Sequence, residues 1–324
     1  MKYCILVISI MFSVLTQAEW VTINTVNTPT QRHENGFVAI NSKLLLVGGR
    51  GDKHTEVLDL NSKTWSQLPK PPIEMHHITP VAYQNDVWVI TGLTGKYPNE
   101  TPLDTIYKFD TTLSQWQEIM SIPKNRRRGA AGVTIHNDNI YIVGGIKNGH
   151  TSGTTNMVDV FNITHQLWET LPDAPHIRDH NNLVVINNQL VALGGRNTSV
   201  HYPKNFTAFF GAVIDTMDLY DIEKRTWSTL PSKLPVPGAG AGSIAINEDI
   251  YFLGGENKHK PAIGTVYKYN IKRNIWTQLP PLNTARHGTN LVAHKQRLYI
   301  GAGSGRQGGR PELTSVEMLT TDAK

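Results

Sequence analysis

Arginine and histidine side chains recur at fixed distances before a turn of small residues that appears six times along the chain. Three consecutive positions, which we call the first, second and third rim positions, carry most of them. The first rim position holds Arg32, Arg128, Arg178 and Arg286, and the next two hold His33, His76, His77, His180 and His287. Guanidinium groups that converge on one opening repel each other unless an anion lies between them, so the pattern predicts a carboxylate, sulfate or phosphate receptor.

Residues that follow the turns add to this set. His150 and Arg196 come after the third and fourth turns, and Glu256 directly follows the fifth, whose rim positions hold only glycine and alanine. A carboxylate there would face a gap in a cationic collar. We expect the ligand to be bound by Arg32, His33, His76, Arg128, His150, Arg178, Arg196 and Arg286.

Proton transfer is the chemistry that the imidazoles would add. Histidine titrates near neutrality, and arginine stabilises a carboxylate or an enolate. We therefore expect a catalytic role for His77, His180, His287 and Glu256. In the alternative, the arginines pair internally with backbone carbonyls or with acidic residues of a neighbouring repeat.

A metal site needs several of these imidazoles close to one another. The repeats distribute them around a ring, and the neighbouring arginines oppose a cation. We therefore expect no metal and no other cofactor.

One repeat unit explains the spacing of all these residues. A run of β-branched and aromatic residues ends in a small-residue pair, a second run ends in Asp or Asn, and a Trp follows, as in Gly144-Gly145, Asn162 and Trp168. The repeat length is near the roughly 50 residues typical of a blade with four short strands. The six pairs are Gly48-Gly49, Thr91-Gly92, Gly144-Gly145, Gly194-Gly195, Gly254-Gly255 and Ala302-Gly303.

The sixth unit ends without its Trp, and the missing strand stands at the other end of the chain. Trp20 lies about as far before Arg32 as Trp65 lies before the next rim segment. We therefore predict an all-β, six-bladed propeller whose last blade is closed by the N-terminal strand. Closure of this kind leaves no open sheet edge.

Through its Gly pairs, its Tyr/Phe-Asp motifs and its spaced Trp residues, the chain resembles the kelch family over residues 19–324. The resemblance implies a kelch-type propeller. Some kelch propellers act on sialic or uronic acids, which suggests an acidic carbohydrate or another small anionic molecule as ligand, bound and isomerised or cleaved. The kelch enzyme galactose oxidase needs a cysteine in its propeller. The only cysteine here, Cys4, lies before residue 19, which argues against that chemistry. The alternative function is a non-catalytic scaffold for a protein partner.

The long insert of the fourth unit, residues 197–211, leaves two alternatives open. Its aromatic residues either form a wall over the mouth of the channel or pack on their own blade; they are Tyr202, Phe206, Phe209 and Phe210.

The N-terminus and the overall charge bear on location and partners. Residues 1–18 combine Lys2, an apolar run and small residues ending at Ala18, which is typical of an export signal, so we expect a secreted or periplasmic protein with no membrane span after cleavage. A net charge of +5 on 324 residues, without a long basic tract, does not indicate nucleic-acid binding.

Overall fold

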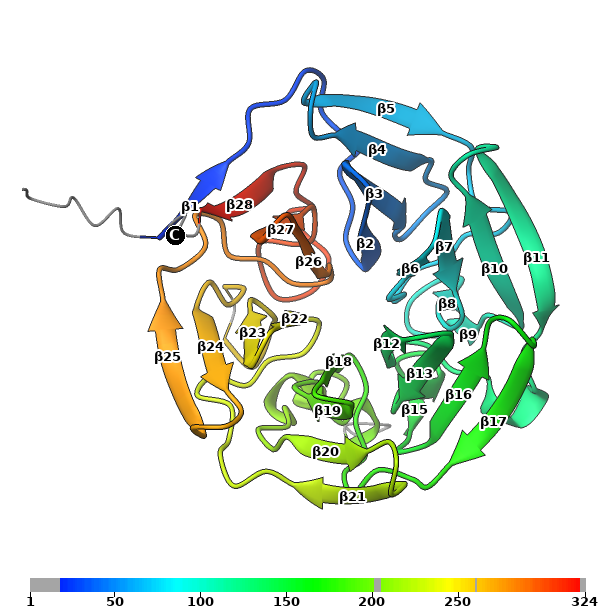
Figure 1. The fold of residues 1–324 in the computed structure, drawn as a ribbon, viewed down its shortest axis with the longest axis vertical. Helices are drawn as coiled ribbons and strands as arrows, with labels where there is room; N and C mark the ends of the chain where they lie inside the picture. The colour runs from blue at the N-terminus through cyan, green and yellow to red at the C-terminus, as the bar shows by residue number, and fades with distance from the viewer. Residues whose placement is uncertain (1–17, 201–204, 260, 321–324) are drawn as a thin grey trace, which may run out of the picture.

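Each sequence repeat forms one antiparallel four-stranded sheet in the computed structural model, which describes residues 18–200, 205–259 and 261–320. The six sheets surround a central channel as the blades of a propeller, with the first strand of each blade nearest the axis (Figure 1). The predicted six-bladed, all-β fold is confirmed.

The first three blades follow one another along the chain. Blade 1 contains β2 (Asn35–Ile40), β3 (Lys43–Gly48), β4 (Thr55–Asp59) and β5 (Thr64–Leu68). Blade 2 contains β6 (Val81–Tyr83), β7 (Asp86–Val89), β10 (Thr105–Asp110) and β11 (Gln115–Ser121). Blade 3 contains β12 (Gly132–His136), β13 (Asn139–Val143), β16 (Val158–Asn162) and β17 (Leu167–Leu171).

The remaining blades complete the circle. Blade 4 contains β18 (Asn182–Ile186), β19 (Gln189–Leu193), β20 (Asp218–Asp221) and β21 (Thr226–Thr229). Blade 5 contains β22 (Gly242–Ile246), β23 (Asp249–Leu253), β24 (Val266–Asn270) and β25 (Ile275–Leu279). Blade 6 contains β26 (Leu291–His294), β27 (Arg297–Gly301), β28 (Val316–Thr320) and, from the start of the chain, β1 (Glu19–Thr22).

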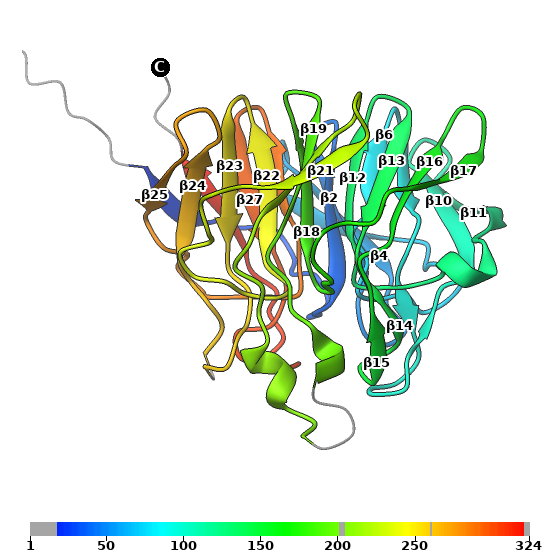
Figure 2. The same cartoon turned by 90° about the horizontal axis from the view of Figure 1, so that it is seen from below.

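The loops on one face carry the short elements. These are the hairpins β8 (Leu93–Thr94) with β9 (Thr101–Pro102) and β14 (Ile146–Asn148) with β15 (Ser152–Thr154), and the 3-10 turns η1 (Lys124–Arg126), η2 (Thr198–Val200) and η3 (Ala208–Gly211). Figure 2 shows β14, β15 and the turns of the fourth-blade insert projecting from the same face of the ring. We call this the loop face.

Apolar side chains on both faces of the inner strands hold neighbouring blades together. Between blades 2 and 3, for example, Trp88 and Ile90 share a buried cluster with Ile140 and Phe161. Because each blade buries both faces against its neighbours, the hydrophobic core is itself a ring.

The N-terminal strand closes that ring as predicted. β1 pairs with β28, with Trp20 opposite Leu319, and Trp20 is 4% exposed. The Asn283 side chain donates a 2.7 Å hydrogen bond to the Trp20 carbonyl. Residues 1–17 lie outside the described part of the chain, so the export signal and cleavage after Ala18 stay predictions.

Backbone hydrogen bonds also join the blades around the channel. In five blades, the amide at the third rim position donates to the carbonyl of the same position in the preceding blade. Asn35, next to the third position, completes the circle by donating to the Gly288 carbonyl at 3.2 Å. The other five bonds are His77 to Glu34, Ala130 to His77, His180 to Ala130, Gly240 to His180 and Gly288 to Gly240, at 2.6–3.0 Å. We call these six bonds the rim ring.

The small-residue pairs permit a second set of close contacts. The Gly49 amide donates to the Met75 carbonyl of the next blade at 2.9 Å, and a Cβ on Gly48 would stand 2.2 Å from that oxygen. Both glycines have positive φ. Glycine is therefore required here for the turn and for the approach of the next blade.

A search of the described ranges finds no helix long and apolar enough to cross a membrane.

Closure by β1 predicts that its one buried side chain stabilises the whole propeller. Trp20→Ala should lower the free energy of unfolding by about 3–5 kcal/mol, because a buried aromatic side chain is lost, and deletion of residues 19–24 should lower it further. Val21→Ala, on the exposed face of the same strand, should change it by less than about 0.5 kcal/mol. Thermal and urea unfolding measure these effects. A deletion variant as stable as the full chain would show that β1 does not close the ring.

Candidate functional site

A cavity of about 480 Å3 opens on the loop face over the rim ring. Its charged lining residues are Glu34, Arg50, Arg196, Glu256 and Arg310, and its imidazoles are His33, His77 and His150. Tyr97, Phe209 and Phe210 form an aromatic wall. The fourth-blade insert thus contributes to a wall over the mouth, which is the first of the two alternatives for residues 197–211.

The arginines of the first rim position do not line this cavity, which corrects the predicted collar. All four are at most 1% exposed, and each guanidinium points into its own blade. There it binds backbone carbonyls and a carboxylate of the third long strand. The pairs are Arg32–Glu56, Arg128–Asp159, Arg178–Asp218 and Arg286–Glu317.

The physical reason lies in the Gly pair. The carbonyl of its first residue points into the blade and needs a donor, and Arg32 binds that of Gly48 at 2.8 Å as Arg286 binds that of Ala302 at 2.9 Å. The carboxylate then balances the buried charge. The internal-pairing alternative therefore holds, although the acid comes from the same blade and not from its neighbour.

A signal in the sequence could have revealed these pairs. In each repeat, one residue stands two places before the small-residue pair and faces a residue of the next long strand. Wherever the repeat has Arg at the first rim position, that facing residue is Glu or Asp. The two repeats without the arginine carry Met75 and Gly238, and at the acid position they carry Tyr107 and Tyr267. This internal covariation predicts ion pairing.

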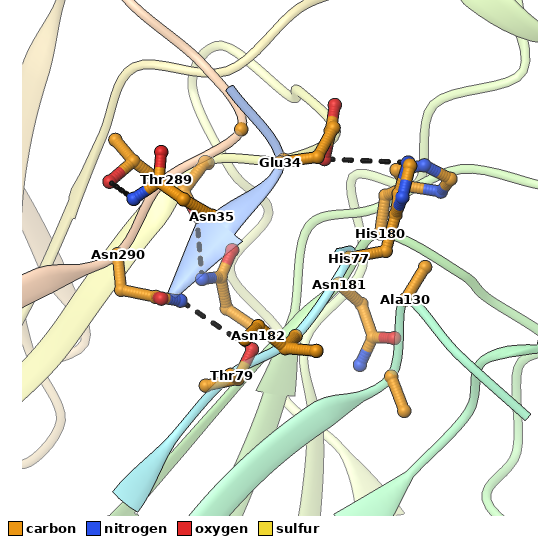
Figure 3. Close-up of a pocket in the computed structure, with 15 residues that line it drawn as sticks. Glu34, Asn35, His77, Thr79, Ala130, His180, Asn181, Asn182, Thr289 and Asn290 are labelled. Atoms are coloured by element: carbon orange, nitrogen blue, oxygen red, sulfur yellow. Dashed lines mark hydrogen bonds and ion pairs between the residues drawn. The ribbon is translucent and has the colours of Figure 1, made fainter. Parts of the chain in front are cut away.

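The third rim position is what directs side chains into the channel. Its backbone is left-handed in all six blades, with φ of +51° to +68°. Glycine and, less readily, alanine fill it in three blades, but Glu34, His77 and His180 occupy it in the others. Figure 3 shows these three side chains beside one another, above a smaller channel cavity lined by Asn and Thr residues.

Three histidines from different blades meet here. The rings of His77, His150 and His180 lie with centroids 4.9–5.2 Å apart in edge-to-face contacts. All three are at most 6% exposed. The sequence placed two of them on a ring and the third in a loop, and it did not predict that they touch.

Each imidazole of this triad is oriented by a partner outside it. Nδ1 of His150 lies 3.0 Å from a Glu100 oxygen, and Nδ1 of His180 lies 2.6 Å from Asp179. Nδ1 of His77 lies 2.6 Å from Nδ1 of His76, the predicted ligand residue that is buried behind it and does not line the cavity.

Glu256 does not face a gap, because the adjacent blades fill it. Its carboxylate accepts from Arg196 at 2.6 Å and from the Gly308 amide at 2.8 Å, and it lies 3.4 Å from His287 Nε2. Antiparallel bridges fix both partners, because Asp179 pairs with Arg196 and Ala239 with Glu256. The predicted catalytic residues His77, His180, His287 and Glu256 therefore surround one region, and their catalytic role stays a prediction.

The remaining polar groups lie at the edge of the cavity. His33 contacts Glu312 at 2.8 Å, and Arg50 binds Glu100 at 2.6 Å beneath the Tyr97 ring. The sequence marks Arg50 and Glu100 only as candidates in the loops after the Gly pairs, and it gives no specific role to Glu34.

Burial and charge fix the protonation states of the site. Burial lowers the pKa of His77 well below its usual value and lowers that of His150, so both imidazoles are neutral at pH 7. Burial alone would raise the pKa of Glu34, but His180 and His287 hold it at about 2. Burial likewise opposes ionisation of Asp179, and the hydrogen bond from His180 brings its pKa to about 2. The site therefore combines the neutral imidazoles of His77 and His150 with ionised carboxylates.

The internal pairing of the rim arginines predicts a structural role for them. Arg178→Ala should lower the free energy of unfolding by about 3–5 kcal/mol, because it leaves Asp218 buried without its guanidinium partner. Arg225→Ala, which removes an exposed pair with Glu169, should cost less than about 1 kcal/mol. Urea unfolding compares the two. Wild-type stability of the Arg178→Ala variant would contradict a structural role for this arginine.

Comparisons with known proteins agree with the repeat and the fold. Residues 8–257 match the family model of the Attractin/LZTR1 beta-propeller, and residues 237–283 match that of the Kelch motif. The chain is 24% identical over 302 residues to Kelch-like protein terF of Aspergillus terreus, covering 87% of this chain and 63% of that protein. It is 21% identical over 267 residues to Kelch-like protein 38 of Rattus norvegicus, covering 80% and 42%.

The chain thus spans less than two thirds of the length of these curated relatives. The solved structure of YjhT superposes with a TM-score of 0.75 at 15% identity, covering 93% of this chain and 98% of that one, which shows a shared fold. Six blades, four of them with a buried Arg–carboxylate pair, closure by the N-terminal strand and these family matches lead to one conclusion: the chain belongs to the kelch-repeat propellers of the Attractin/LZTR1 beta-propeller family.

Proposed function

We propose that the cavity on the loop face binds a small acidic carbohydrate. The observation that carries the proposal is the combination of an aromatic wall with charged hydrogen-bonding groups around a single cavity of about 480 Å3. This volume lies in the range of about 300–1,000 Å3 that small-molecule sites have.

The lining suits a sugar ring. Tyr97 and Phe210 offer apolar surface to the C–H face of a pyranose, and Glu34 and Glu256 are ionised acceptors for its hydroxyl groups. The pKa of Glu256 is lowered because His287 and Arg196 outweigh the opposing effect of burial.

Arg310 favours an acidic group on that sugar. It lines the cavity, it is exposed, and within the described ranges its guanidinium forms no ion pair. Arg50 and Arg196, by contrast, already contact Glu100 and Glu256. A ligand carboxylate would therefore find its cationic partner at Arg310.

Isomerisation or cleavage of the bound sugar stays a further prediction. It is tested by following candidate sugars by NMR in the presence of the protein. Conversion above the rate without protein would support it.

A protein partner is the second candidate function, because an interaction scaffold pairs its rim arginines internally and exposes aromatic side chains on its loops. The pairs are present, and Tyr97 is 49% exposed. If no sugar binds, a protein partner becomes the favoured function.

Arg310 supplies the test of the first proposal. By calorimetry and thermal shift, glucuronic, galacturonic or N-acetylneuraminic acid should bind more tightly than glucose or galactose. Arg310→Gln should weaken binding of the acid by about 10–100-fold, the value of one charge-assisted hydrogen bond, and leave binding of neutral sugars unchanged.

The matched control is Arg306→Gln, an exposed arginine in the same loop that does not line this cavity. It should bind the acid as the unmodified protein does. Binding that disappears with rising salt in both variants alike would show diffuse attachment to a basic protein and would contradict the proposal. Preference for neutral sugars would contradict it too.

A further inference from the structure

The histidine triad has the arrangement of a metal centre. One ring nitrogen from each of His77, His150 and His180 lies within 4.8 Å of one from each of the others. An equilateral triangle of that size places its corners about 2.8 Å from its centre, so inward shifts of under about 1 Å reach the 2.0–2.1 Å of a Zn–N bond. The three residues come from separate blades and loops, so no local sequence motif produces the contact.

Hydrogen bonds outside the triad identify the nitrogens that would bind. His76 Nε2 donates to the Gly95 carbonyl at 3.1 Å, so its Nδ1 carries a lone pair, and His77 must donate to it from Nδ1. Carboxylates Glu100 and Asp179 accept from Nδ1 of His150 and His180. The lone pair of each triad imidazole is therefore on Nε2.

Partners of this kind are typical around metal ligands. A ligating histidine usually donates its other N–H to a carboxylate or another acceptor, which fixes its tautomer and raises its basicity. Asp179 is itself held by the Thr198 amide and by the hydroxyl groups of Thr154 and Thr198, at 2.6–3.0 Å. His77 Nε2 is buried and has no hydrogen-bond partner in the described part of the chain, and a Glu34 carboxylate oxygen lies 3.5 Å from it.

The charge around the triad also favours a cation. Four carboxylates surround it, from Glu34, Glu100, Asp179 and Glu256, against two guanidinium groups, from Arg50 and Arg196. These carboxylates and guanidinium groups together leave two negative charges, which a divalent ion would neutralise.

We propose that His77, His150 and His180 bind a divalent transition metal of the Zn2+ class through three Nε2 atoms. His77 and His150 both line the loop-face cavity, so a fourth ligand would reach the metal from that cavity. Three imidazoles with one open position are a set that Zn2+ adopts at reactive centres.

Both reasons for expecting no metal from the sequence are removed by the structure. The imidazoles converge instead of spreading around the ring, and the four rim arginines point into the blades. Arg196 contacts the triad, donating to His180 Nε2 at 3.2 Å. It also binds Glu256 and Thr198 and stacks on Phe209, so it keeps those contacts when the metal replaces it at His180.

The test uses the purified protein after treatment with a chelator. Titration with Co2+ should give visible d–d absorption typical of tetrahedral nitrogen coordination, saturating at one equivalent, and Zn2+ should displace it. His77→Ala, His150→Ala and His180→Ala should each weaken Zn2+ binding by more than about 100-fold, since loss even of an outer-shell partner costs 10–100-fold. Asp179→Asn should fall within that 10–100-fold range.

The control variants are His136→Ala and His176→Ala, which alter histidines outside the site and should bind Zn2+ unchanged. Circular dichroism and thermal unfolding identify variants that do not fold. If all three alanine variants fail to fold, the Co2+ spectrum of the unmodified protein and the Asp179→Asn titration decide. Absence of Co2+ absorption, or equal binding by triad and control variants, would overturn the proposal.

The metal and sugar proposals fail separately. Metal binding is measured without any sugar, and the Arg310 variant lies outside the triad. If the chelator-treated protein still binds the sugar, sugar binding does not need the metal, and the Co2+ and Zn2+ titrations alone decide the metal proposal.

Discussion

The rim ring is the constraint on which the rest of this structure depends. Six backbone hydrogen bonds join the third rim positions of neighbouring blades into a closed circle at the axis. To make them, that position adopts a left-handed backbone in every blade. Such a conformation costs a residue other than glycine about 1–3 kcal/mol. The same twist turns whatever side chain is present toward the channel.

This geometry explains why the site is asymmetric in a symmetric fold. Two blades have glycine at the left-handed position. Three others carry Glu34, His77 and His180 there, which destabilises the backbone locally. The residues directly after the Gly pairs form a second layer above, and there Arg50, Arg196 and Glu256 supply the charges. Loops complete the site with His150 and an aromatic wall. Function is thus concentrated where the fold leaves the choice of side chain open.

The arginines of the first rim position are structural, in contrast to the variable side chains that form the site. They are spaced like a binding collar, yet each one satisfies a carbonyl of its Gly pair and a carboxylate of its own blade. Such a pair is costly to break once buried. The arginine joins the segment before the inner strand to the turn at the small-residue pair, which the next blade contacts. It thereby stabilises the backbone that forms the rim ring.

Much of the fold could be predicted from the sequence, because the Gly pairs and Trp residues of a repeat fix its strands and the lone Trp20 fixes the closure. The collar could not, because spacing alone does not tell whether Arg178 points to the axis or into its blade. The covariation of Arg with Glu or Asp across the six repeats held that information. Contact between His150 and His77 could not be predicted either, since it depends on how a loop of blade 3 folds over its neighbour.

Hydrogen exchange tests the central claim most directly. The amides of the rim ring, at Asn35, His77, Ala130, His180, Gly240 and Gly288, should exchange only through global unfolding, as slowly as the inner strands. Exchange at the rate of loop-face amides, while the inner strands such as β13 stay protected, would show that side-chain packing alone joins the blades and that the rim ring does not organise the site.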